Sequence, residues 1–121
     1  MQEITLETIT GVHDRILAKA GGDYRIISEG NLHQMVFRAN LTEDPVSRAA
    51  SLFYMLCAFP AFREGNRRTA CHLAEMLICT DNIHGKLPCE EVRALIRGID
   101  TFTVEIEDVE RFLLSCAGKR Y

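Results

Sequence analysis

The chain has 121 residues, of which 47% are hydrophobic and 26% are charged, and its formal net charge is −3 at pH 7. This length predicts a single domain over 1–121, and the composition excludes disorder, collagen-like repeats and low-complexity sequence. The acidic balance argues against a general nucleic-acid-binding protein, which needs clustered Lys and Arg. Because there is no membrane-length apolar run and no secretory signal, we expect a cytoplasmic domain with neither nucleic acid nor membrane among its direct partners.

Helical periodicity dominates the first third of the chain. Apolar residues recur at a spacing of three to four from Leu6 onward, and the pattern stops at Gly21 and Gly22, where glycine favours a helix exit. The segment 23–30 predicts either a short extended piece or a packed loop. A short helix is predicted over 31–39.

The middle of the chain predicts two buried helices that are joined by a polar loop. Asp44 and Pro45 are an N-cap acid and a proline at the first helical position, and the apolar segment 49–59 follows them. A helix that is apolar all round is one that other helices surround. Pro60 ends this helix, and a second largely buried helix is predicted after Asn66.

Two further helices are predicted in the last third. A polar loop over 80–86 precedes a helix that begins near Pro88, and the final helix has an acidic first turn, which suits the helix dipole. The acidic residues of 105–110 are expected to form a solvated helix face. The sequence therefore predicts an all-α fold, a single bundle of about six helices.

Five cysteines are spread along the chain with no zinc-ligand spacing and no C-x-x-C motif. We expect all of them to be small buried hydrophobic residues of a reducing compartment, without a functional role. They are Cys57, Cys71, Cys79, Cys89 and Cys116.

The loop between the two buried helices is unusually polar for its position. Gly65 permits positive φ or close backbone approach, and the helix that follows offers unpaired N–H groups and the positive end of its dipole. Arg67 and Arg68 add two positive charges, and Asn66 adds an amide donor, so the loop suits phosphate binding. Glu64 could hold a Mg²⁺ ion that bridges phosphate oxygens. The alternative is a solvated turn with surface arginines.

This loop resembles the signature loop of the Fic/Doc superfamily, whose pattern is H-x-F-x-(D/E)-(G/A)-N-x-R. The matching residues are Phe62, Glu64, Gly65, Asn66 and Arg68. The death-on-curing (Doc) branch is the more similar one. Its first helix resembles 12–22, its central helix resembles 49–59, and Arg67 with the following Thr69 and Ala70 is Doc-like.

The resemblance implies a six-helix fold and a loop that binds ATP with Mg²⁺. Fic enzymes transfer AMP to hydroxyl side chains, whereas Doc toxins are kinases that phosphorylate a threonine of elongation factor Tu. A Doc toxin is held inactive by an antitoxin protein. The implied partners are therefore an antitoxin and a protein substrate such as elongation factor Tu.

The resemblance also assigns roles to the loop residues. Glu64 would be the metal-site acid, and Phe62 would anchor the loop in the core. The phosphate and nucleotide contacts would come from Gly65, Asn66, Arg67 and Arg68.

One departure from the family pattern affects the chemistry. The family's histidine, which takes the proton from the acceptor hydroxyl, falls on Pro60, whose side chain cannot act as a base. General-base catalysis is worth about 10²–10⁴ in rate, so we predict impaired phosphotransferase activity. His72, one helical turn beyond Arg68, is a candidate substitute base, whereas His13 is expected to be a structural hydrogen-bonding residue.

Three functions follow from these observations. The first is a Doc-like toxin-family protein that binds nucleotide with impaired transfer. The second is an active Doc-type kinase or nucleotidyltransferase that uses another base. The third is a non-catalytic module that binds an antitoxin-like helix in a groove between its own helices. The family's self-inhibitory motif is absent, because Arg25 stands where its hydroxyl residue should be, so any inhibitor is expected to be a separate chain.

Overall fold

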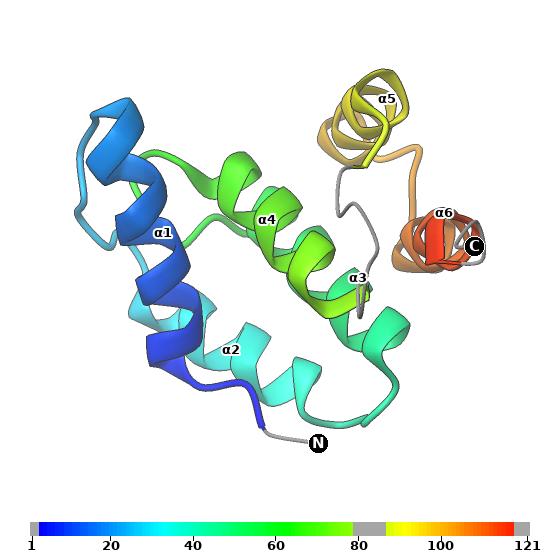
Figure 1. Ribbon diagram of the computed structural model, residues 1–121, viewed down its shortest axis with the longest axis horizontal. Coiled ribbons are helices and arrows are strands. Elements are labelled where there is room, and N and C mark those ends of the chain that lie inside the picture. The colour runs from blue at the N-terminus through cyan, green and yellow to red at the C-terminus, as the bar shows by residue number, and fades with distance from the viewer. Residues whose placement is uncertain (1–2, 79–86, 118–121) are drawn as a thin grey trace.

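The computed structural model describes residues 3–78 and 87–117 (Figure 1). Within these ranges the chain forms six α-helices: α1 (Leu6–Ala20), α2 (Glu29–Ala39), α3 (Pro45–Ala58), α4 (Asn66–Ile78), α5 (Cys89–Asp100) and α6 (Ile106–Ala117). This confirms the predicted all-α fold. The predicted loop 80–86 lies outside the described residues, as does Cys79.

The central helix is α3, and none of its residues is exposed. It packs against α2, α4, α5 and α6, with α1 and α2 on one side of the α3–α4 pair and α5 and α6 on the other (Figure 1). As predicted, Asp44 caps the helix by accepting a 2.9 Å hydrogen bond from the Ser47 N–H, and Pro45 occupies its first turn. The absence of exposed residues along α3 explains why its sequence is apolar throughout the second half, 52–58.

The ends of α1 follow the sequence signals. Thr5 and Thr8 form a reciprocal capping box at its start, and the helix ends at Ala20 before Gly21, which has a φ of 81°. The next helix, α2, begins two residues earlier than predicted. Ser28 caps it by accepting a 3.0 Å hydrogen bond from the Asn31 N–H. Serine is a common N-cap residue but also occurs in loops and turns, so its presence alone does not fix the start of the helix.

The segment between α1 and α2 takes the extended form of the two predicted alternatives. Ile26 forms an isolated antiparallel bridge with Phe62. The N–H of Ile27 donates to the Ala61 carbonyl at 2.7 Å, and the N–H of Arg63 donates to the Arg25 carbonyl at 2.9 Å. These bonds hold the loop between α3 and α4 against the segment that joins α1 to α2.

The cysteine prediction is corrected at one position. Cys57, Cys71 and Cys116 are partly buried, but Cys89 is exposed. Cys89 is the first residue of α5, where the helix has not yet packed against the core. None of the helices in the described ranges is long and apolar enough to cross a membrane.

Candidate functional site

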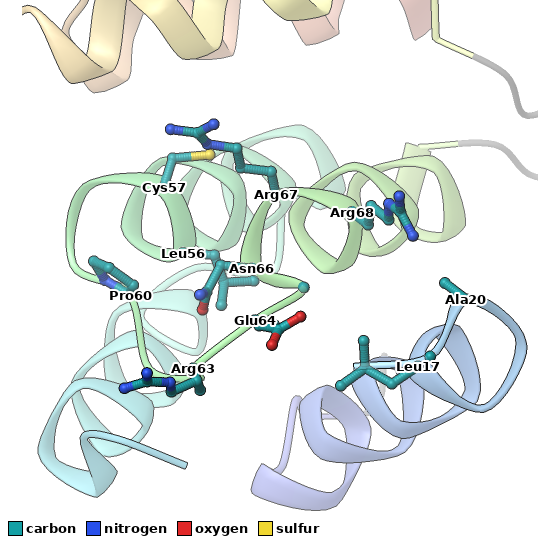
Figure 2. A pocket seen from close by; sticks show the side chains of 12 residues that line it. Leu17, Ala20, Leu56, Cys57, Pro60, Arg63, Glu64, Asn66, Arg67 and Arg68 are labelled. Atoms are coloured by element: carbon teal, nitrogen blue, oxygen red, sulfur yellow. The ribbon is translucent and has the colours of Figure 1, made fainter. Parts of the chain in front are cut away.

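The loop that joins α3 to α4 opens onto a pocket of about 580 Å³ (Figure 2). Three parts of the chain line it. Leu17, Ala20 and Gly21 come from the end of α1, and Leu56 and Cys57 come from the end of α3. The remaining lining residues are Pro60 in the loop and the consecutive run from Arg63 to Arg68. We call this cavity the loop pocket.

The side chain of Asn66 gives the loop its shape. Its Oδ1 accepts hydrogen bonds from the N–H groups of Ala61 and Phe62 at 3.2 and 3.1 Å, and its Nδ2 donates to the Phe62 carbonyl at 2.7 Å. Asn31 adds a fourth bond by donating from Nδ2 to the Pro60 carbonyl at 3.0 Å. The side-chain oxygen of Asn66 is therefore occupied within the loop. The backbone N–H of Asn66 remains for a ligand.

A buried histidine of α1 contacts the loop between α3 and α4 at two points. The Nε2–H of His13 donates to the Glu64 carbonyl at 2.8 Å, and its ring stacks on Phe62 with centroids 3.6 Å apart. Both side chains are almost fully buried. A Cβ at Gly65 would lie 3.4 Å from the His13 ring, and Gly65 has a φ of 86°, so glycine is required there.

The start of α4 presents an electropositive surface to the loop pocket. The first N–H to donate within α4 is that of Thr69, which bonds to the Gly65 carbonyl at 3.0 Å, so the N–H groups of Asn66, Arg67 and Arg68 have no partner among the described residues. The helix dipole adds its positive end at the same place. This arrangement fits an anionic group such as phosphate.

The two arginines of this turn differ in their ion pairing. The Nη2 of Arg67 donates to Asp100 Oδ2 at 2.7 Å, which ties the start of α4 to the end of α5. Arg68 has no ion-pair partner in the part of the chain that the structure describes. Of the two, Arg68 is therefore the cation that a phosphate can bind without displacing another group.

Glu64, to which the family resemblance assigns the role of metal-site acid, lines the loop pocket. Its carboxylate lies between the start of α4 and the end of α1 in Figure 2, and a Cβ at Gly22 would come within 2.9 Å of Glu64 Oε1. No cluster of three or more acidic, histidine or cysteine ligands exists in the described ranges. A Mg²⁺ ion bound at Glu64 would thus take its other ligands from phosphate oxygens and water, as this ion commonly does.

Asp23, Arg25 and Arg63 form a charged cluster beside the loop. Arg25 forms a double hydrogen bond with the Asp23 carboxylate, which lowers the pKa of Asp23 to about 2. Arg63, which lines the loop pocket, lies 3.9 Å from the same carboxylate. Asp23 therefore remains ionised at neutral pH and offsets part of the positive charge near the pocket.

No histidine is among the described residues that line the loop pocket. Pro60, on which the family resemblance places the motif histidine, lines the loop pocket. His72 is exposed and lines a separate groove of about 420 Å³ with Arg15 and Lys19, so the structure does not bring it to the loop. Cys57 does line the pocket, but burial raises the pKa of its thiol to about 12, which keeps it protonated at neutral pH.

Sequence reasoning missed the contribution of α1 to this site. Leu17, Ala20 and Gly21 line the pocket, and His13 bonds to the Glu64 carbonyl, although all four residues lie about forty or more positions before the loop. No local signal marks them, because the pairing of α1 with the loop is a tertiary contact.

Comparison with known proteins bears on the same part of the chain. No curated protein sequence matches the chain. The model of the Fic/DOC family matches residues 3–78, which include α1 to α4 and the whole loop. Since this match covers more than half of the chain, the protein belongs to the Fic/DOC family.

Proposed function

We propose that the loop pocket binds the phosphates of a nucleoside triphosphate with Mg²⁺, and that the protein is a Doc-like family member with impaired transfer of phosphate to a protein hydroxyl. The observation that carries this proposal is the start of α4, where three backbone N–H groups and the Arg68 side chain, all without a partner among the described residues, lie at one cavity. ATP is the nucleotide that the family resemblance implies.

Each residue would contribute to binding in its own way. The N–H groups of the first turn of α4 would donate to phosphate oxygens, and Arg68 would add charge-assisted hydrogen bonds. Glu64 would hold Mg²⁺, which neutralises phosphate charge when it is bound. His13 would keep the Glu64 backbone in place through its 2.8 Å hydrogen bond, and so position the acid.

Pro60 explains why binding and transfer are separated in this proposal. A proline side chain accepts no proton, and no histidine or ionised thiol replaces it among the described residues of the pocket. Loss of a general base lowers the rate by about 10²–10⁴, while the phosphate-binding groups are unaffected. The expected result is a protein that binds nucleotide and transfers phosphate poorly.

The binding part is tested by calorimetric titration of ATP and Mg²⁺. Arg68→Ala should weaken binding by about 10-fold or more, because a hydrogen bond to a charged group is lost. The matched control is Arg93→Ala, which removes an exposed α5 arginine outside the loop pocket and should leave the affinity unchanged. Wild-type protein that binds no ATP, or equal affinities for all three proteins, would contradict the proposal.

The transfer part is tested by restoring the base. Pro60→His should raise phosphate transfer from γ-labelled ATP to protein hydroxyls by about 10²–10⁴ over wild type. Pro60→Ala is the control, since it removes the proline ring without adding a base. Equal transfer by wild type and Pro60→His would show that the missing histidine does not limit activity.

A second candidate function rests on the groove between α1 and α4. Its lining combines apolar Val12 and Ile16 with the basic side chains of Arg15 and Lys19. This pattern fits an acidic amphipathic helix of a separate antitoxin-like chain. An acidic amphipathic peptide should bind wild-type protein in a fluorescence anisotropy assay and lose affinity for Lys19→Glu. Equal affinity for both proteins would exclude this groove as the binding site.

A further inference from the structure

Phe102 occupies an unfavourable backbone conformation in the turn between α5 and α6. Its φ is 61°, the only positive φ of a non-glycine residue in the described ranges. The Thr103 N–H donates to the Gly98 carbonyl at 2.8 Å, and the Phe102 N–H donates to the Ile99 carbonyl at 3.2 Å. This is the Schellman pattern, in which the position of Phe102 is usually glycine. A phenylalanine there costs conformational free energy.

The side chain of Phe102 is not packed in the core, so its burial does not offset this cost. It is 89% exposed, the highest value among the large hydrophobic residues that the structure describes. Glycine would make the same turn with less strain, because the two hydrogen bonds involve only the backbone. Backbone strain that the fold does not need is an outlier from which a functional role can be inferred.

A cavity of about 240 Å³ lies close to this turn. Met55, Tyr54 and Phe59 line it from α3 and the residue that follows that helix, and Ile106 lines it from the start of α6. A cavity of roughly 150 Å³ with apolar walls holds one benzene ring, so this one can accept a phenylalanine side chain. Glu105 and Ile106 both line the cavity, so it lies beside the turn between α5 and α6 that carries Phe102.

We propose that this surface is a two-fold interface between two copies of the chain, with Phe102 of each copy inserted into the cavity of the other. A two-fold interface pairs one surface with itself, so it needs a projecting group and its receptor side by side. Phe102 and the neighbouring cavity meet that requirement.

The charges at the cavity support the same arrangement. Arg38 and Glu105 both line it, both are exposed, and neither has an ion-pair partner in 3–78 or 87–117. Across a two-fold axis, Arg38 of one copy can face Glu105 of the other, and the reciprocal pair forms at the same time. The surface is thus complementary to itself in charge as well as in shape.

The first test is sedimentation velocity over a range of protein concentrations. Wild type should associate reversibly to a dimer, and Phe102→Gly should raise the dissociation constant by about 30-fold or more, as expected for a central aromatic anchor. At concentrations where both proteins are monomers, Phe102→Gly should melt at the same or a higher temperature than wild type. That result separates loss of the interface from misfolding.

Two controls sharpen the test. Leu114→Ser removes another exposed apolar side chain, 61% exposed on α6 and outside this cavity, and should leave the dissociation constant unchanged. Arg38→Glu and Glu105→Arg should each weaken the dimer, and the double variant should recover most of the loss. Monomeric wild type at every concentration, an effect of Leu114→Ser equal to that of Phe102→Gly, or no recovery in the double variant would overturn the proposal.

Discussion

Thr69 has the only buried side-chain oxygen or nitrogen without a hydrogen-bond partner in the described part of the chain. It lies on the inner face of α4, one turn into the helix, among core residues. A buried hydroxyl without a partner costs free energy, because the water that it loses on folding is not replaced.

Replacing this hydroxyl with a methyl group should therefore stabilise the protein. Thr69→Val should raise the free energy of unfolding by about 1 kcal/mol, measured by urea denaturation. The control is Thr10→Val, because the Thr10 hydroxyl donates to the Leu6 carbonyl at 3.1 Å and no such gain is expected. A loss of stability in Thr69→Val would mean that the hydroxyl has a partner in solution.

The Asp23 carboxylate makes a pH-dependent contribution at the edge of the loop. Its pKa is about 2 in the folded protein, chiefly because of the side-chain hydrogen bond from Arg25, against an ordinary value of 3.8. A lowered folded-state pKa stabilises the fold above the unfolded pKa, and the contribution is lost as the pH falls from about 4 to about 2.

Arg25→Gln should return the pKa of Asp23 toward 3.8, because the main partner of the carboxylate is lost. The pKa is measured by NMR titration of the Asp23 side-chain carboxyl carbon. Arg93→Gln, which removes a distant arginine, should leave the titration unchanged. An unchanged Asp23 titration in Arg25→Gln would assign the shift to other groups.

Helices and their ends were largely predictable from local chemistry. Asp44 with Pro45 marks the start of α3, and Gly21 marks the end of α1, since capping depends on residues within one turn. The pairing of Ile26 with Phe62 was not predictable, because an extended segment of few residues gains its stability from a partner far along the chain.

Two glycines inside helices should respond oppositely to alanine. A Cβ at Gly98 of α5 would overlap Val104 Cγ2 and lie 2.9 Å from Val104 Cβ, and the β-branched Val104 side chain cannot easily move. Gly98→Ala should thus destabilise the protein by about 1–3 kcal/mol. At Gly11 of α1 the nearest atom is 3.8 Å away, so Gly11→Ala should stabilise it by about 0.5–1 kcal/mol.

Thermal and urea denaturation of the two variants provide the measurement, and each variant serves as the control for the other. Equal shifts in stability would mean that the turn between α5 and α6 can move away from the added methyl group. That outcome would weaken the link between Gly98 and the close approach of α5 and α6.

At the scale of the whole molecule, the motif residues were predictable and the pocket was not. Register with the family pattern identifies Phe62, Glu64 and Arg68. The residues of α1 that line the pocket and the hydrogen bond from His13 to the loop depend on the packing of α1 against α4. This packing could not be predicted from the local sequence of either helix. His72 shows the same limit, since helical spacing relates it to Arg68 but its side chain lines a different cavity.

The ion pair between Arg67 and Asp100 links α5, which lies beyond the family match, to the loop pocket. If phosphate binds as proposed, Asp100→Asn should free Arg67 and raise the affinity for ATP. The gain should stay below about 5-fold, because exposed ion pairs contribute about 0.2–1 kcal/mol.

Calorimetry of Asp100→Asn measures this change, and Glu91→Gln is the control. Glu91 is an exposed α5 acid outside the loop pocket, so the control changes the net charge equally without releasing Arg67. Equal affinities for the two variants would show that total charge, and not the release of Arg67, sets the effect.

The hydrogen bonds that shape the loop use the main-chain carbonyl of Pro60 and the side chains of Asn31 and Asn66. The side chain at position 60 takes no part in them, so a substitution there leaves the groups that make these hydrogen bonds in place. Proline and histidine codons can differ by a single base. If position 60 corresponds to the motif histidine, as proposed, a change between the two residues is a small genetic step, and the base could be lost or regained while the fold stayed the same.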